Sequence, residues 1–391
     1  MRIGKGLCAA ALAALAGLAS PAQAQPQGVS DAEIVIGTHQ DLSGPVSALG
    51  TYLRDGMQLA VDRVNAAGGI HGRKLKLVVE DSGFDPKRAV LATQKLIERD
   101  RIFALVAALG SSPVAASQPL ALDADVPVLF SGTPADLTYT PFHKLKFGLA
   151  PPYGEQVRAQ VKYAVEKLGK KKFGVLYQDD ETGQNVLRAA EEQLKVHGQT
   201  VAERASYKRG EVDLSSQIAR LKAADVDVVI LGTIIRETAA ARVEAKKQGW
   251  PVDMMANQAG MNNAVVKIGG DAVEGLYANA HFISLSAQEQ TPEITALVAR
   301  YREMFGKEPD DGMIYGYLAT MLFAEAAKGA GRNLTTDGFV KALEGVKDFR
   351  TAFAGSPATF GPGQRLGTRA TIMTQVRGGK FVPISEPLTY N

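Results

Sequence analysis

Cysteine is almost absent from this sequence, in which Cys8 is the single thiol among 391 residues. Without a second cysteine, the chain cannot form an internal disulfide framework or a thiolate metal site. If the first residues are removed, as argued below, no thiol remains and a cysteine nucleophile is excluded as well. Such a chain tolerates an oxidising compartment because it has nothing there to oxidise.

Histidine is scarce too, and the five histidines are scattered with no partner at metal-ligand spacing. They are His39, His71, His143, His197 and His281. No G-x-S-x-G motif occurs, and the glycines of residues 361–367 (GPGQRLG) have the wrong spacing for a dinucleotide-binding loop. The sequence therefore predicts a protein that is not an enzyme, with no metal site and no cofactor.

Long apolar runs are missing except near the start of the chain. There, Arg2 and Lys5 precede an apolar stretch at residues 7–19, and an A-x-A sequence follows at residues 22–24. This pattern is typical of a secretory signal peptide, cleaved before Gln25. A lipid anchor is disfavoured because Cys8 lies near the beginning of the apolar stretch. We expect an exported protein located in the periplasm.

Neither sign of charge dominates. The net charge of the full chain is +3, and removal of Arg2 and Lys5 with the signal leaves 3 − 2 = +1. This balance argues against nucleic acid or an anionic membrane as the main partner. A chain of 391 residues with 46% hydrophobic content is long enough for two domains of ordinary size.

Short apolar, β-branched runs alternate with segments of helical periodicity. Strands are predicted at residues 34–36, 75–79, 103–107, 126–130, 173–177, 200–205 and 226–231, with helices between them. The alternation predicts parallel sheets wound in right-handed βαβ units, and its restart near residue 157 predicts two lobes. A helical tract at residues 292–345 is expected to pack back on one lobe. Two short strands are expected in the tail, at residues 370–376 and 380–383.

Small hydroxyl residues and glycine follow two of these strands directly. Gly110, Ser111 and Ser112 come after one strand and open a helix, and residues 131–133 (Ser-Gly-Thr) come after the next. In a parallel sheet these strand ends lie at one edge, where free amide groups and the positive end of a helix favour a carboxylate or phosphate. Simple helix capping is the alternative for each loop alone. Two such loops on adjacent strands favour a ligand site.

Four motifs together resemble the type I periplasmic solute-binding proteins of the leucine/isoleucine/valine class. They are residues 36–45 (IGTHQDLSGP), 64–72 (VNAAGGIHG), 80–86 (EDSGFDP) and 269–275 (GGDAVEG). The resemblance covers the mature chain and implies an α/β fold of two doubly wound lobes joined by a three-stranded hinge. It places lobe 1 at residues 25–147 and 279–354, and lobe 2 at residues 148–278 and 355–391. The lobes would close around a small molecule and present it to an ABC permease in the inner membrane.

The resemblance also implies a ligand site. Ser111 and Ser112 fall where a serine holds the ligand carboxylate, and Gly132 and Thr133 where backbone and hydroxyl groups hold an amino-acid moiety. Ser131, in the same loop, is a further candidate for the site. Other positions depart from the family. They are Leu49 for an aromatic wall, Thr182 for a tyrosine, Thr233 near another, Gln258 for a glutamate that pairs with the α-ammonium, and Phe84 with Gly110 for a cysteine pair.

Gln258 leaves the ligand class open. Burying an ammonium without an anionic partner costs several kcal/mol, so a neutral amide fits an amine-free aromatic or aliphatic carboxylic acid at least as well. A nearby acid could instead restore the charge, and the candidates are Asp41, Asp179, Asp180 and Glu237. We predict capture of a branched-chain type amino acid, with an amine-free carboxylic acid as one alternative and a sensor domain without transport as the other. His39 is expected to be buried and hydrogen-bonded rather than in the cleft.

Overall fold

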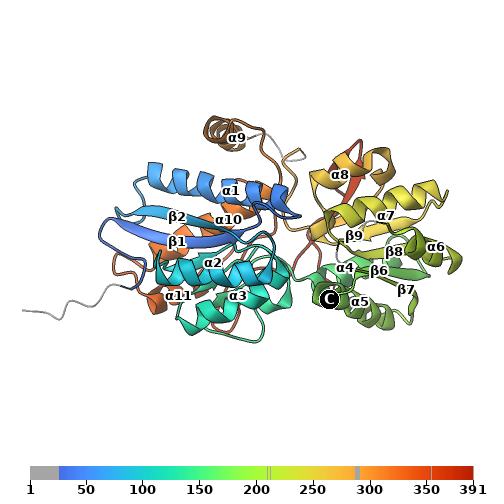
Figure 1. The fold of residues 1–391 in the computed structure, drawn as a ribbon, viewed down its shortest axis with the longest axis horizontal. Helices are drawn as coiled ribbons and strands as arrows, with labels where there is room; N and C mark the ends of the chain where they lie inside the picture. Colours follow the sequence, from blue (N-terminus) through green and yellow to red (C-terminus); the bar gives the residue numbers. More distant parts are fainter. Residues whose placement is uncertain (1–25, 209, 212, 287–290, 354, 391) are drawn as a thin grey trace, which may run out of the picture.

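The computed structural model of the protein describes residues 26–208, 210–211, 213–286, 291–353 and 355–390. The chain forms two α/β lobes that lie side by side, with α1 to α3 in one lobe and α4 to α8 in the other (Figure 1). The predicted signal peptide lies outside the described residues. Within them, no helix combines the length and the apolar character needed to cross a bilayer.

The first lobe is built on a five-stranded parallel sheet of order β2-β1-β3-β4-β5. Its strands are β1 (Glu33–Gln40), β2 (Lys74–Asp81), β3 (Ala104–Val106), β4 (Val128–Leu129) and β5 (Lys146–Phe147). Successive residues of a strand point to opposite faces, so Ile34 and Ile36 pack on one side and Val35 on the other. Both faces are therefore covered, which explains why these strands are apolar almost throughout.

Helices cover the two faces of this sheet. One face packs against α1 (Ser47–Ala66), α10 (Gly312–Gly329) and α11 (Thr336–Glu344), and the other against α2 (Pro86–Glu98) and α3 (Ser111–Asp123). A further helix, α9 (Pro292–Phe305), lies beside α1 (Figure 1). The helical tract therefore packs back on a lobe, as predicted, although α10 and α11 follow most of the second lobe in the sequence.

The second lobe contains a seven-stranded sheet of order β12-β11-β10-β9-β8-β6-β7. Its strands are β6 (Phe173–Gln178), β7 (Val201–Tyr207), β8 (Val228–Gly232), β9 (Asp253–Ala256), β10 (Tyr277–Ala280), β11 (Ile372–Arg377) and β12 (Lys380–Pro383). All neighbours pair in parallel except β11, which is antiparallel to β10 and β12. The tail strands were predicted, whereas β9 and β10 were not.

Helices also flank this second sheet. On one face lie α4 (Tyr153–Glu166) and α5 (Glu181–Val196), and on the other α6 (Ser215–Ala223), α7 (Ile235–Lys247) and α8 (Asn263–Gly269). Short 3-10 turns occur at Asp136–Thr138, Gln258–Gly260 and Gly270–Val273. The arrangement confirms the predicted fold class of two wound α/β lobes.

Three segments of the chain connect the lobes: the stretch between β5 and α4, the stretch after β10, and the stretch that leads to β11. Isolated bridges pair Gly148 with Leu366 and Phe282 with Gly355, so the crossing segments contact one another. Because three paired segments bend more easily than a packed core, they form a hinge. The predicted lobe boundaries stay a prediction, and β10 itself runs to Ala280, two residues past the proposed limit at 278.

Helices α1 and α10 approach each other closely through glycine. A Cβ atom on Gly56 would fall on the carbonyl oxygen of Met313, and one on Gly316 would fall on that of Leu53. Both neighbours are backbone atoms, which cannot rotate away as a side chain can. The absence of side chains at these two positions therefore sets the distance between the helices.

Candidate ligand-binding site

A cavity lies between the lobes, where the carboxyl ends of the strands of both sheets meet. It has two adjoining parts, which share Leu49, Leu109, Gly132, Thr133, Tyr153 and Ala259. The first chamber, about 700 Å³ with open solvent included, extends from Ser111 to Thr233 of the second lobe. The second chamber, about 670 Å³ on the same measure, extends from Gln258 to Asp311. This is where ligands bind in open α/β sheets.

Ser111 and Thr133 form the polar wall that the first lobe contributes. The two hydroxyl oxygens are 2.7 Å apart and hydrogen-bonded to each other. Ser111 begins α3, and Gly110 before it has a φ of 96°, a conformation that favours glycine. The start of α3 thus directs its first amide groups and the Ser111 hydroxyl to the same place, which suits a carboxylate.

Tyr153, the first residue of α4, adds a third hydroxyl beside this pair. Burial raises the pKa of Tyr153 to about 12, although the hydroxyls of Thr133 and Ser111 lower it in part. The phenol is therefore protonated at neutral pH and able to donate a hydrogen bond. Three hydroxyl groups from both lobes thus converge on one point of the first chamber.

The second lobe supplies the opposite wall of the first chamber from the ends of β6, β8 and β9. Asp180 caps α5 by accepting a hydrogen bond from the Gly183 amide at 3.0 Å. The buried Thr233 hydroxyl is 2.6 Å from that of Thr238. Asn257 accepts the Ala259 amide at 2.8 Å, while its buried side-chain nitrogen has no hydrogen-bond partner among the described residues. The amide nitrogen of Asn257 is a donor available to a ligand.

The second chamber combines apolar walls with a few polar groups. Phe282, at the hinge, and Tyr315, on α10, are among its aromatic residues. The Tyr315 hydroxyl donates to the carbonyl oxygens of Phe130 and Ser131, at 3.0 and 2.8 Å, and so fixes the end of β4. Gln258 is held by Gln156, whose side-chain oxygen accepts the Gln258 amide at 2.9 Å. The chamber is therefore shaped by groups that are already fixed without a ligand.

Eight of the nine residues predicted for the site line the cavity. They are Leu49, Ser111, Ser112, Gly132, Thr133, Thr182, Thr233 and Gln258. Ser131 does not: it is 2% exposed, and its carbonyl oxygen is turned toward Tyr315. Its place in the site is therefore corrected to one in the support behind it, because Ser131 is buried and its carbonyl oxygen accepts the hydrogen bond of the Tyr315 hydroxyl.

Of the four acids considered as replacements for a glutamate at position 258, one lines the cavity. Asp180 lies in the first chamber, whereas Asp41, Asp179 and Glu237 line neither chamber. The Asp41 carboxylate instead accepts the amides of Gly44 and Val46, and so folds the loop after β1. His39 is fully buried, as predicted, and its Nε2 is 3.0 Å from the Ser117 hydroxyl, but its Nδ1 has no hydrogen-bond partner among the described residues.

Several cavity residues escaped the sequence argument, among them Tyr153, Tyr207, Phe282, Asp311 and Tyr315. Tyr153 begins α4 after a crossing segment, and Phe282 follows β10, a strand that was not predicted. Asp311 and Tyr315 come from α10, which returns from the far end of the sequence. Tyr207 is the last residue of β7. The rule that placed Ser111, which takes polar residues at the ends of parallel strands, could therefore have predicted Tyr207 as well. The resemblance expects an aromatic residue at position 49, where this chain has Leu49. Aromatic side chains from other elements line the cavity instead.

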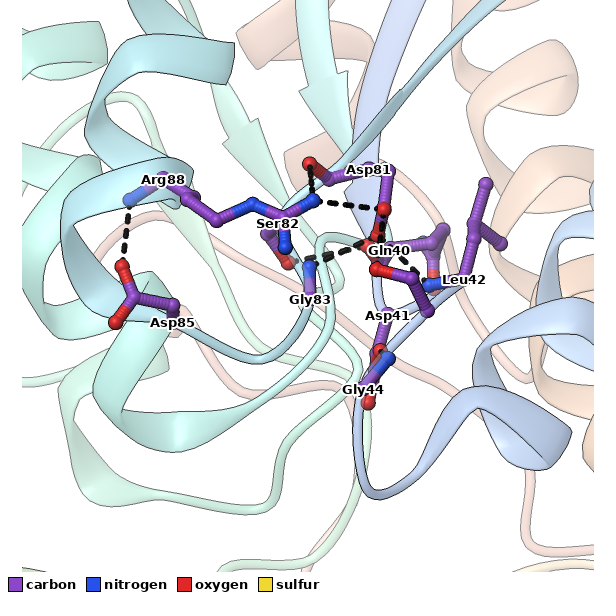
Figure 2. A network of polar contacts seen from close by, with 10 residues as sticks. Gln40, Asp41, Leu42, Gly44, Asp81, Ser82, Gly83, Asp85 and Arg88 are labelled. Carbon is purple, nitrogen blue, oxygen red and sulfur yellow. Dashed lines mark hydrogen bonds and ion pairs between the residues drawn. The ribbon is translucent and has the colours of Figure 1, made fainter.

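Two loops beside the first chamber are fixed by Asp81 at the end of β2 (Figure 2). Its carboxylate accepts the Leu42 amide at 2.9 Å, the Ser43 hydroxyl at 2.6 Å and the Gly83 amide at 2.8 Å, and it pairs with Arg88 at 2.8 Å. Partial burial alone would raise the pKa of Asp81, but these hydrogen bonds and the Arg88 charge hold the pKa at about 2. The first and third family motifs are therefore joined in one network that holds the cavity wall in place.

The positions matched to a cysteine pair are also adjacent. A Cβ atom on Gly110 would lie 2.5 Å from the ring of Phe84, so the ring packs directly on the glycine. Phe84 has a φ of 59°, which is uncommon for a non-glycine residue. In this chain the Phe84 ring therefore packs against Gly110 at the two positions that the resemblance matches to a pair of cysteines.

Comparison with known proteins agrees with this architecture. The family described as periplasmic binding protein matches residues 33–380. A relative from Brucella abortus, named Leu/Ile/Val-binding protein homolog 8, is 27% identical over 368 residues, which cover 90% of each chain.

Solved structures share the fold at lower identity. A branched chain amino acid ABC transporter protein from Thermus thermophilus with bound valine has a TM-score of 0.83 at 19% identity, covering 92% of this chain and 97% of that one. A fatty acid ABC transporter substrate-binding protein from Thermomonospora curvata has a TM-score of 0.82 at 24% identity, covering 93% and 94%. Proteins of this fold thus include one named for amino acids and one named for fatty acids.

Proposed function

We propose that this chain, which belongs to the periplasmic binding protein family, captures a small amino acid of branched-chain type in the cavity between its lobes and delivers it to an ABC permease. The family consists of substrate-binding proteins rather than enzymes.

The observation that carries the proposal is the convergence of Ser111, Thr133 and Tyr153 at the start of α3. Three hydroxyl groups and the positive end of a 13-residue helix favour an anionic group of the ligand. The apolar side chains of Leu49 and Leu109, which line both chambers, suit an aliphatic side chain. A carboxylate with an aliphatic body is the ligand that fits both.

Lobe closure follows from the distribution of these groups. Ser111 and Thr133 belong to the first lobe, whereas Tyr153 and Asn257 belong to the second, so a ligand contacts all four only when the lobes approach. The ligand shifts the equilibrium toward the closed form by its additional affinity for that form. The closed form is the one that we expect a permease to recognise.

Thr133→Val should weaken binding because it removes a hydroxyl while keeping the volume of the side chain. A hydrogen bond to a charged group contributes roughly 1.5 to 3 kcal/mol, so we expect a loss of about 10- to 150-fold in affinity. Thermal shift with leucine, isoleucine, valine, benzoate and aliphatic carboxylates identifies the ligand, and calorimetric titration of the variant measures the loss. A ligand at 100 times its dissociation constant stabilises by about 2.7 kcal/mol.

The matched control is Thr93→Val, which makes the same change at a buried threonine on α2 that lines neither chamber. Its affinity should equal that of the unmodified protein. Equal affinities for both variants would place the carboxylate elsewhere and refute the proposed site.

A further inference from the structure

Asp311 lies at the start of α10 and lines the second chamber with only 3% of its surface exposed. Its position at a helix start suggests a capping role, but its side chain makes no cap hydrogen bond. The neighbouring Asp310 accepts the Gly312 amide at 3.2 Å instead. The Asp311 carboxylate is therefore buried for a reason other than capping.

The two carboxylate oxygens of Asp311 differ in their hydrogen bonding. One oxygen, Oδ1, accepts the Leu285 amide at 2.7 Å and so attaches the hinge segment to α10. The other, Oδ2, is buried and accepts no hydrogen bond from any described residue. Buried polar atoms in native proteins usually have a hydrogen-bond partner, so Oδ2 needs a donor that the described residues do not supply.

Among the described residues, no positively charged side chain lines the cavity beside this carboxylate. Neither chamber is lined by Lys, Arg or His among the described residues, and the other charged neighbour of Asp311 is Asp310, which is also acidic. Burial raises the pKa of Asp311 to about 6, against the lowering effect of Ser284 and the Leu285 amide. At neutral pH the group is an ionised, uncompensated carboxylate at the wall of a ligand cavity.

We propose that Asp311 pairs with the protonated amine of the ligand, so that the cavity takes zwitterionic amino acids in preference to carboxylic acids that lack an amine. This inference rests on the proposed function, because it assumes that the ligand carboxylate binds at Ser111 and Thr133. The two chambers share Thr133 and Tyr153, so the hydroxyl groups of the first and the carboxylate of the second face adjoining parts of one cavity.

The neutral Gln258 is consistent with this assignment. It lines the same chamber as Asp311, and its backbone amide is bound by Gln156. The negative charge that the resemblance places at position 258 is thus supplied at position 311, from another element across the same chamber. Two carboxylates in one small chamber would repel each other, so the presence of Asp311 also explains a neutral residue at 258.

Calorimetric titration with matched ligands tests the assignment. The pairs are L-leucine with 4-methylpentanoate and 5-aminopentanoate with pentanoate, each differing only in the amine. We expect at least one amine-bearing member to bind about 100-fold more tightly than its partner. Asp311→Asn should remove this preference by weakening the amine-bearing ligand about 100-fold, with the amine-free acid within about threefold.

Asp310→Asn is the control, because it makes the same change one residue earlier at a carboxylate that lines neither chamber. The preference for the amine should survive in it. Absence of a preference in the unmodified protein, or equal losses for both members of a pair in Asp311→Asn, would overturn the assignment of Asp311. Loss of binding of both members in Thr133→Val reports separately on the carboxylate site, so the two proposals can fail independently.

Discussion

Gly316→Ala should lower the free energy of unfolding by about 3 kcal/mol, at the upper end of what overpacking of a core usually causes. The new methyl group would overlap the Leu53 carbonyl oxygen and lie 2.9 Å from its carbon and 3.0 Å from the Met57 amide nitrogen. Relief requires α1 and α10 to separate along their contact. Urea denaturation monitored by circular dichroism measures the loss as a lower midpoint.

Gly329→Ala provides the comparison within the same helix. There the added methyl group would meet only the Ala342 side chain, at 3.4 Å, an ordinary contact. Alanine is favoured over glycine in a helix by up to about 1 kcal/mol, so this variant should be as stable as the unmodified protein or slightly more stable. Equal stabilities of the two variants would show that the helices can move apart without loss.

Asp311→Asn should stabilise the ligand-free protein at neutral pH, by up to about 3 kcal/mol relative to its effect in acid. The unfolded chain ionises Asp311 near its ordinary pKa of 3.8, whereas burial raises the pKa of the folded state to about 6. Below pH 3.8 the group is neutral in both states and destabilises neither. Between pH 3.8 and 6 the unfolded state gains ionisation that the folded state resists, so stability falls as the pH rises and then levels off.

The measurement is the difference in unfolding free energy between Asp311→Asn and the unmodified protein at pH 3.5 and at pH 7.5. Taking the difference cancels the titration of all other groups that keep their environment. Asp310 is the charged neighbour of Asp311, and Tyr153 and Tyr315 are the other ionisable residues that line the second chamber. Burial raises the pKa of both tyrosines, so neither titrates in this range. A difference that does not grow with pH would show that Asp311 ionises freely in the folded protein.

Asp311 thus combines a cost in stability with a place at the ligand cavity. Groups that destabilise the empty protein are commonly kept where function needs them. A ligand amine that pairs with this carboxylate would offset the cost, and the affinity and the stability of the protein are then linked through one side chain.

The sequence was sufficient for most strands of the two sheets, though not for β5, β9 and β10, and for part of the site. Apolar runs such as Val228–Gly232 are buried on both faces, so they are recognisable without tertiary information. Ser111 and Thr133 could be placed because parallel strands end at one edge of a sheet, a rule that needs only local order. Ser131 was misplaced because the rule does not say which residue of a loop faces outward.

Asp311 and Tyr315 could not be found in this way. They reach the cavity because α10 returns across the hinge, and the Tyr315 hydroxyl contacts a carbonyl 184 positions away. Local patterns do not encode such distances. The resemblance placed a glutamate-like position at 258, but a charge can move to another element that faces the same space, and one sequence does not show where it went.

The return of the chain across the hinge also sets the order in which the first lobe can be completed. Phe103, beside β3, packs edge-on against Phe323 and Phe339, which lie on α10 and α11. A chain that emerges amino end first therefore leaves one face of its first sheet uncovered while most of the second lobe, from α4 to β10, is made. Contacts over such separations form slowly and expose apolar surface meanwhile. The first lobe therefore cannot complete its core until α10 and α11 are made, and keeping the chain unfolded until then avoids a long-lived intermediate with exposed apolar surface.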